Sequence, residues 1–294
     1  MVAMSVILSA VLPVFITAFI GYAVARLDKP FDNKTVAFLV SSVGTPALVF
    51  FNLAKTPIVP AALIGMTAAT LLAIAFYLVV GAAFLKAAGL SARTYLPSLA
   101  FPNSGNLGLP LALYAAGESG LEFAIVIFSV TAILNLTIGQ AVAAGEGKWG
   151  LVARSPILPA VGLGLVFAYG GIPLPLWAAN TLDLLGNLTI PLMLLMLGTS
   201  LAKIQVTTFG RSALLGSLRI GMGIVAGFTI SALFGFTGAE RIAFIVQCAM
   251  PVAVYNYLFA QMYDNEPEAV ASLVVVSTLI SVITVPLLLA VVVR

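Results

Sequence analysis

Two short stretches of the chain combine proline with amide side chains inside otherwise apolar segments. The first is Phe101–Pro110, which reads FPNSGNLGLP, and the second is Met250–Asn256, which reads MPVAVYN. Proline removes a backbone hydrogen bond and breaks a helix. In hydrocarbon an unpaired backbone N–H or C=O costs several kcal/mol, so irregular backbone persists only inside protein or beside a wet cavity. A matched pair of such breaks indicates a binding site of the kind that transporters build.

The chemistry that these stretches favour is the binding of an anion. Each break starts a half-helix, whose first N–H groups lack an intrahelical partner and carry partial positive charge. Amide and hydroxyl side chains at the same level add neutral donors and acceptors. The candidate substrate-binding residues are Pro102, Asn103, Ser104, Asn106, Pro251, Tyr255 and Asn256. The alternative is that these residues only complete the hydrogen bonds and the packing of the broken helices.

Further polar residues lie deep inside apolar segments. Four of them, Thr131, Asn135, Gln247 and Ser277, are candidates for an ion site or a polar network. Amide and hydroxyl oxygens can bind sodium without a carboxylate, and the alternative is ordinary hydrogen bonding between helices. Arg219 is the one basic residue well inside an apolar segment. It is a candidate for attracting substrate, and the alternative is that its long side chain reaches the inner membrane surface.

The acidic residues make a proton switch at the breaks unexpected. They lie at or near the ends of apolar segments, and Asp183 is the deepest of them. The chain has no histidine, which removes imidazole as a proton relay or a metal ligand. A carrier coupled to sodium, a carrier coupled to protons by some other group, and a carrier driven by the gradient of the anion itself all stay open. No cofactor and no firm metal site are expected.

The composition places the chain in a membrane. Hydrophobic residues make up 62% and charged residues 8% of the sequence, and the mean hydropathy is +1.17. A soluble globular domain does not have these values. Without histidine, and with acids only near segment ends, the residues of an intramembrane protease cannot be assembled, so no enzyme is predicted. The expected partners are the lipid bilayer and a small organic anion, and nucleic acid is not expected.

Apolar runs long enough to span a bilayer predict an all-α polytopic protein with ten membrane spans. Charged residues and Gly or Pro residues mark the ends of these runs. The spans are approximately Val2–Ala25, Lys34–Leu53, Ile58–Ala87, Ala92–Ala116, Glu122–Ala144, Leu151–Tyr169, Leu174–Leu201, Thr208–Phe236, Ala239–Tyr263 and Pro267–Val293.

Corresponding residues in the two halves of the chain predict an internal repeat. Four correspondences occur in chain order at offsets of 145 to 149 residues: Ser9-x-x-Leu12-Pro13 with Ser155-x-x-Leu158-Pro159, Thr45-Pro46 with Ile190-Pro191, Pro102 with Pro251, and Glu118 with Glu266. Residues 1–144 and 150–294 are therefore expected to be two five-helix repeats. Because five is odd, the second repeat is inverted relative to the first, which lets the two breaks cross near the bilayer midplane.

The basic residues predict the orientation in the membrane. Near helix ends, nine Lys and Arg lie on one side and three on the other. The richer side should be cytoplasmic, which places both termini outside the cell membrane. The nine are Arg26, Lys29, Lys34, Lys86, Arg93, Lys148, Arg154, Lys203 and Arg211, and the three are Lys55, Arg241 and Arg294.

The stretch Pro102–Pro110 resembles the Asn-rich fourth helix, ending in Gly and Pro, of the auxin efflux carrier family. This family includes plant PIN-type auxin transporters and bacterial carriers proposed for malonate, malate and related carboxylates. The resemblance covers essentially the whole chain. It implies a bile-acid-symporter / NhaA-like fold with crossing helices 4 and 9, and an elevator mechanism. Spans 1, 2, 6 and 7 would form the scaffold and a homodimer interface, and spans 3–5 and 8–10 the transport unit.

One feature separates this chain from the plant members. It lacks their large cytoplasmic insert between spans five and six, together with the phosphorylation sites found there. The predicted function is a secondary carrier for small organic anions, such as mono- or dicarboxylates, with auxin-like aromatic carboxylates included. The alternatives are a sodium-coupled, bile-acid-symporter-like carrier and an anion channel.

Overall fold

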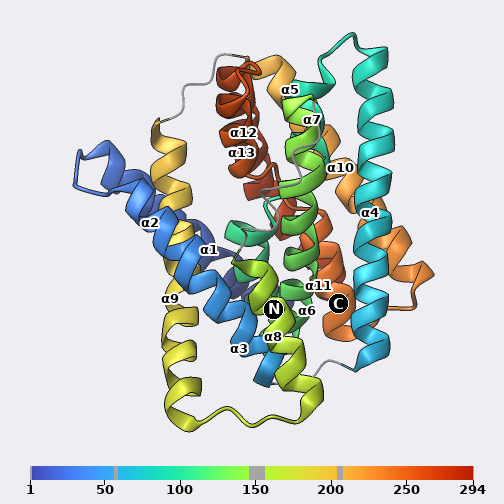
Figure 1. The fold of residues 1–294 in the computed structure, drawn as a ribbon. Coiled ribbons are helices and arrows are strands. Elements are labelled where there is room, and N and C mark those ends of the chain that lie inside the picture. The colour runs from blue at the N-terminus through green and yellow to red at the C-terminus, as the bar shows by residue number, and fades with distance from the viewer. Residues whose placement is uncertain (1, 56–58, 146–155, 204–207, 294) are drawn as a thin grey trace.

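The protein is a multi-pass membrane protein built from helices (Figure 1). The computed structural model describes residues 2–55, 59–145, 156–203 and 208–293. Within these residues six helical segments are long and apolar enough to cross a membrane. They are Asn33–Lys55, Pro60–Ala87, Ser104–Ala144, Leu176–Ala202, Phe209–Leu233 and Pro267–Val292. Lys148, Arg154, Ser155 and Arg294, which entered the orientation and the repeat, lie outside the described residues.

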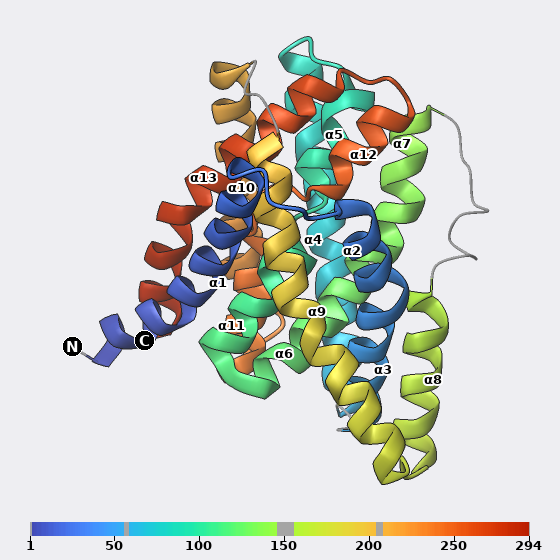
Figure 2. The same cartoon turned by 90° about the vertical axis from the view of Figure 1, so that its left-hand side faces the viewer.

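A first helix group consists of helices that pack mainly on one another. Its members are α1 (Val2–Arg26), α2 (Asn33–Leu39), the π-helical turn η1 (Val40–Gly44), α3 (Thr45–Lys55), α8 (Ile157–Gly170) and α9 (Leu176–Lys203). Helix α1 lies along α9, and α3 lies against both α8 and α9. The α1–α9 contact depends on glycine, since a Cβ atom at Gly198 would overlap the Ala18 carbonyl of α1. This group is on the left in Figure 1 and faces the viewer in Figure 2.

A second helix group contains both breaks. Its members are α4 (Pro60–Ala87), α5 (Ala92–Ala100), η2 (Ser104–Gly108), α6 (Leu109–Leu134), η3 (Asn135–Gly139), α7 (Gln140–Ala144), α10 (Phe209–Leu233), α11 (Gly238–Cys248), α12 (Tyr255–Met262) and α13 (Pro267–Val292). Helix α6 packs on α11, and α10 packs on α13. The two groups touch where α1 meets α6 and α13 and where α9 meets η2.

Helix α6 bends at Gly117, which lies between the fourth and fifth spans expected from the sequence. The backbone there has φ 68° and ψ −163°, a conformation that glycine adopts without a Cβ clash. The bend gives α6 one arm that continues from the first break and a second arm that leads into η3 and α7.

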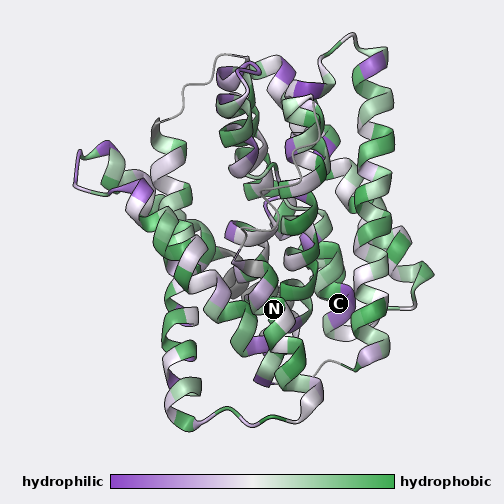
Figure 3. Cartoon of the chain, viewed as in Figure 1, coloured by the Kyte–Doolittle hydropathy of each residue, from purple (hydrophilic) through white to green (hydrophobic). Residues whose placement is uncertain are grey.

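The surface of the helices suits lipid. Large apolar side chains such as Phe19, Val79, Leu176 and Leu287 are more than 60% exposed. Figure 3 shows hydrophobic residues along the length of the helices and hydrophilic residues at the ends of several of them. Apolar residues that face outward at this density would not be stable in water, whereas in a bilayer they contact acyl chains.

Candidate binding site

The two breaks lie against each other and form a crossing. Helix α5 ends at Ala100 and helix α11 ends at Cys248. Beyond these ends Pro102 and Val252 form an isolated antiparallel bridge, and the Asn103 backbone N–H donates to the Pro251 carbonyl at 2.7 Å. The first break therefore donates a backbone hydrogen bond to the Pro251 carbonyl of the second, which pairs backbone groups that irregular structure would leave exposed at membrane depth.

Side-chain hydrogen bonds from two helices, α12 and α13, stabilise this crossing. Asn256 Nδ2 donates to the Phe101 carbonyl at 3.2 Å. Ser277, on α13, accepts from the Val252 N–H at 3.2 Å and donates to the Val274 carbonyl at 3.1 Å. Ser277 was a candidate for an ion site, and the structure places its hydroxyl in the backbone support of the second break.

Buried amide atoms near the breaks have no hydrogen-bond partner among the described residues. Asn103, 3% exposed, has an unpaired Nδ2, and Asn256, 2% exposed, has an unpaired Oδ1. Asn135 Oδ1 and Gln247 Oε1 are likewise buried and unpaired. An unsatisfied buried polar group costs about 1–3 kcal/mol. The crossing thus holds a donor and several acceptors whose hydrogen-bonding capacity is unused.

Two glycines leave room for the unpaired amides of α11 and η3, because a side chain at either position would overlap them. A Cβ atom at Gly108 would overlap Gln247 Oε1, and one at Gly139 would overlap Asn135 Oδ1 and approach the Phe101 ring at 2.9 Å. Gln247 Nε2 donates to the Ala124 carbonyl at 3.5 Å, which turns its oxygen toward Gly108. Thr131 is also buried, at 3% exposure.

The other substrate candidates differ in exposure. Pro102, Ser104 and Pro251 are buried, and Asn106 is half-buried. Tyr255 is 49% exposed, and its ring meets the Phe259 ring edge-on at a centroid distance of 5.4 Å. The Asn106 side chain is therefore partly accessible, while Tyr255 lies on the periphery of the crossing.

Arg219 does not extend to the membrane surface. It is fully buried, and its guanidinium donates to the carbonyls of Leu99, Cys248 and Met250. Its Cζ lies 4.1 Å from the centre of the Tyr77 ring, within cation–π range. This rules out the alternative that the side chain reaches the inner membrane surface. The available signal was chemical, because a guanidinium inside hydrocarbon requires several acceptors, and helix C-termini offer free carbonyls.

The sequence of the chain matches a known protein family. A family model described as membrane transport protein matches residues 6–155 and 146–289. The chain belongs to the auxin efflux carrier family. The family resemblance seen in Pro102–Pro110 is thereby confirmed, and the protein belongs to a family of transporters.

Two archaeal relatives of the auxin efflux carrier family support the same assignment. An uncharacterized transporter of Methanocaldococcus jannaschii is 28% identical over 197 residues, which cover 63% of this chain and 63% of that protein. An uncharacterized transporter of Methanothermobacter thermautotrophicus is 26% identical over 295 residues, which cover 94% of this chain and 95% of that protein. Both names state transport, and neither states a substrate.

A polar cluster at the start of α13 was not predicted from the sequence. Tyr95 donates to Glu266 Oε2 at 3.0 Å, and Arg211 Nη1 lies 3.0 Å from the Tyr95 hydroxyl and 3.5 Å from Glu266 Oε2. The cluster joins α5 and α10 to the loop before α13. These residues are 55 to 171 positions apart, so the sequence contains no local signal for their contact.

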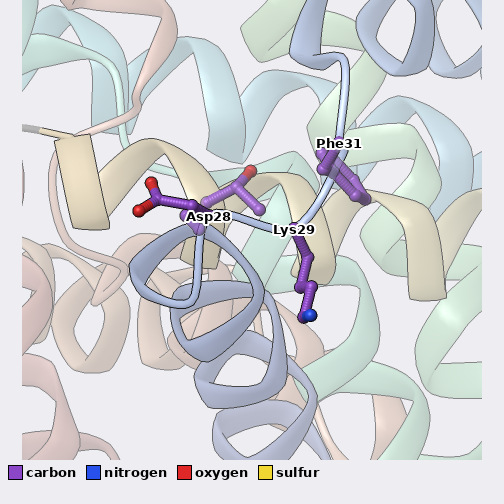
Figure 4. Close-up of a pocket in the computed structure, with 5 residues that line it drawn as sticks. Asp28, Lys29 and Phe31 are labelled. Atoms are coloured by element: carbon purple, nitrogen blue, oxygen red, sulfur yellow. The ribbon is translucent and has the colours of Figure 1, made fainter.

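Two cavities lie in the first helix group of the residues that the structure describes. One of about 200 Å³ is lined by Ala25, Asp28, Lys29, Phe31 and Thr199. Figure 4 shows the Asp28 and Lys29 side chains extending in different directions. A second, of about 60 Å³, lies between η1 and α9. Neither is lined by residues of the crossing.

Proposed function

We propose that this chain is a secondary carrier for small organic anions, such as mono- or dicarboxylates, including auxin-like aromatic carboxylates. The observation that carries the proposal is the crossing itself. It brings together the starts of two half-helices and a buried donor, Asn103 Nδ2, that has no partner among the described residues. Half-helix N-termini favour negative charge, and a buried free N–H suits a carboxylate oxygen.

The proposed architecture is ten spans in two inverted repeats. Spans four and five correspond to the two arms of α6 with their preceding and following helices, and span nine corresponds to α11 and α12. The first helix group would be the scaffold and the homodimer interface, and the second would move as an elevator. The packing of each group on itself supports this division. Both termini are proposed to lie outside the cell membrane.

Coupling to sodium is the alternative that a specific observation favours. Asn135 Oδ1, Gln247 Oε1 and Asn256 Oδ1 are buried acceptors without partners in the described part of the chain, and carbonyl-type oxygens suit hard cations. Transport driven by the anion gradient and the membrane potential requires no such ion.

A ligand-stabilisation screen tests the proposal. Detergent-purified protein would be heated with benzoate, indole-3-acetate, malonate or malate, each with and without sodium. A true ligand raises the unfolding temperature by mass action, and a rise that requires sodium would identify coupling. Saturable exchange of the same labelled anion in liposomes would support a carrier. Unsaturable flux far above carrier turnover would instead indicate an anion channel, and no stabilisation and no flux with any anion would refute the proposal.

A further inference from the structure

We propose that Arg219 is a positioning residue that neutralises the negative ends of both broken helices, so that the crossing has a net charge near +1 and its complex with a monoanion is electrically neutral. This inference rests on the proposed function. It adds the charge class of the preferred substrate and states which step of the transport cycle the membrane potential acts on.

The contacts of Arg219 support the first part. Leu99 is the penultimate residue of α5, Cys248 is the last residue of α11, and Met250 lies two residues beyond it. The Leu99 carbonyl accepts from Nη1 at 2.9 Å, the Met250 carbonyl accepts from Nε at 3.5 Å, and the Cys248 carbonyl accepts from Nη2. One guanidinium thus binds the C-terminal ends of two half-helices that enter the crossing from different parts of the chain.

The charges of the four helix ends lead to the second part. A helix carries about +0.5 elementary charge at its N-terminus and about −0.5 at its C-terminus. The two C-terminal ends at the crossing sum to about −1, which the +1 of Arg219 offsets. The starts of η2–α6 and of α12 remain, and together they contribute about +1. Without Arg219 the four ends would cancel, and the crossing would not attract an anion.

Carbonyls, rather than a carboxylate, are the hydrogen-bond partners of the guanidinium. Arg219 therefore retains its full charge, and in an elevator that charge moves with the second helix group. The whole-helix dipoles add no net charge, and the Lys, Arg, Asp and Glu side chains of this helix group other than Arg219 lie near helix ends or beside the Gly117 bend. The loaded unit then carries zero net charge with a monoanion and −1 with a dianion. The membrane potential acts on the return of the empty unit when the substrate is a monoanion.

Exchange in liposomes isolates the loaded step. Wild-type protein would be reconstituted with the same labelled anion on both sides, and exchange would be measured at 0 and −100 mV, with protein-free liposomes correcting for leakage. Moving one charge through the whole field of 100 mV changes an equilibrium by about 50-fold. An elevator that carries the charge through one third of that field changes the equilibrium by about 4-fold. Benzoate or indole-3-acetate exchange should change by less than about 1.5-fold, whereas malonate or malate exchange should change about 4-fold.

Variants at position 219 separate charge from structure. Arg219→Gln should make monoanion exchange potential-dependent, by about 4-fold, and should weaken monoanion binding by at least about 10-fold. Arg219→Lys retains the charge and should retain the potential-independent exchange. Arg211→Gln is the control, because it removes a charge from the same helix at its partly exposed end. It should leave the potential dependence unchanged.

The outcomes distinguish the two proposals. Saturable monoanion exchange that varies several-fold with potential in the wild type would overturn the inference about Arg219 and leave the carrier intact. This wild-type measurement decides the matter even where Arg219→Gln does not fold. No saturable exchange of any of the four anions would overturn the proposed function, and the inference with it.

Discussion

The two breaks contain the same types of residue and use them differently. In the first, the Asn103 backbone N–H bonds to Pro251, and its side-chain Nδ2 stays unpaired. In the second, the Asn256 side chain is already engaged with the Phe101 carbonyl. Ser277 adds a hydrogen bond to the second break from a third helix. The comparison indicates that the second break holds the crossing together and that the first offers its amide to a ligand.

The first break is followed by a π-helical turn and the second is not. The first leads through η2 into the arm of α6 that ends at the Gly117 bend, whereas the second leads directly into α12. Pro110 lies two residues after η2, and the Leu109 N–H donates to the Ser104 carbonyl five residues back. A proline lacks the N–H that an α-helical turn would use, so the wider turn before it has a local cause. The same arrangement occurs at η1, before Pro46.

The largest effect that separates the breaks should come from Asn256→Ala. It leaves the Phe101 carbonyl without its buried donor, which should destabilise the protein by about 2 kcal/mol. The unfolding temperature in detergent should fall clearly below that of Asn103→Ala, which is the matched control at the other break. Equal unfolding temperatures for the two variants would remove the distinction between them.

Asn103→Ala should affect binding rather than stability. Loss of the free Nδ2 donor should weaken anion affinity about 10-fold, the cost of one hydrogen bond to a charged group. Its unfolding temperature without ligand should match or exceed the wild type, because an unsatisfied buried group is removed. A drop in ligand-free stability, with affinity unchanged, would assign Asn103 a purely structural role.

Ser277→Ala should resemble Asn256→Ala on a smaller scale. The Val252 N–H loses its acceptor, at a cost of about 1 kcal/mol. Thermal unfolding measures this loss. Thr278→Ala on the same helix is a suitable control because the Thr278 hydroxyl, among the described residues, donates within α13, to the Val274 carbonyl. If the control destabilises the protein as much as Ser277→Ala, then support of the second break is not what Ser277 provides.

Asn106→Ala should have the smallest effect. Asn106 is half-buried, so water partly competes for its amide, and a loss of affinity of about 3-fold is expected with folding and any dimer intact. Titration of the stabilising anion by thermal shift gives the change. An unchanged affinity would place the ligand closer to Asn103 than to Asn106.

The parts of the structure that were predictable have local causes. Hydropathy and composition identify a membrane protein because each apolar segment needs lipid whatever its neighbours are. The breaks at Pro102 and Pro251 are readable because proline disrupts its own helix. The family resemblance in Pro102–Pro110 was confirmed by the match of the family model. Arg219, by contrast, was visible as an unusual residue, but its partners were not.

The sequence by itself determined that this chain is a membrane protein, that two of its helices must break, and that it belongs to a transporter family. Only the tertiary structure decided that the two breaks are in contact. It also decided that the Asn256 side chain bonds across them while Asn103 Nδ2 has no partner among the described residues, and that the Arg219 guanidinium binds the C-terminal ends of α5 and α11. The physical reason is the distance along the chain. The hydrogen bonds of Arg219 with Leu99 and of Asn256 with Phe101 join residues 120 and 155 positions apart, and such contacts form only when the whole bundle packs.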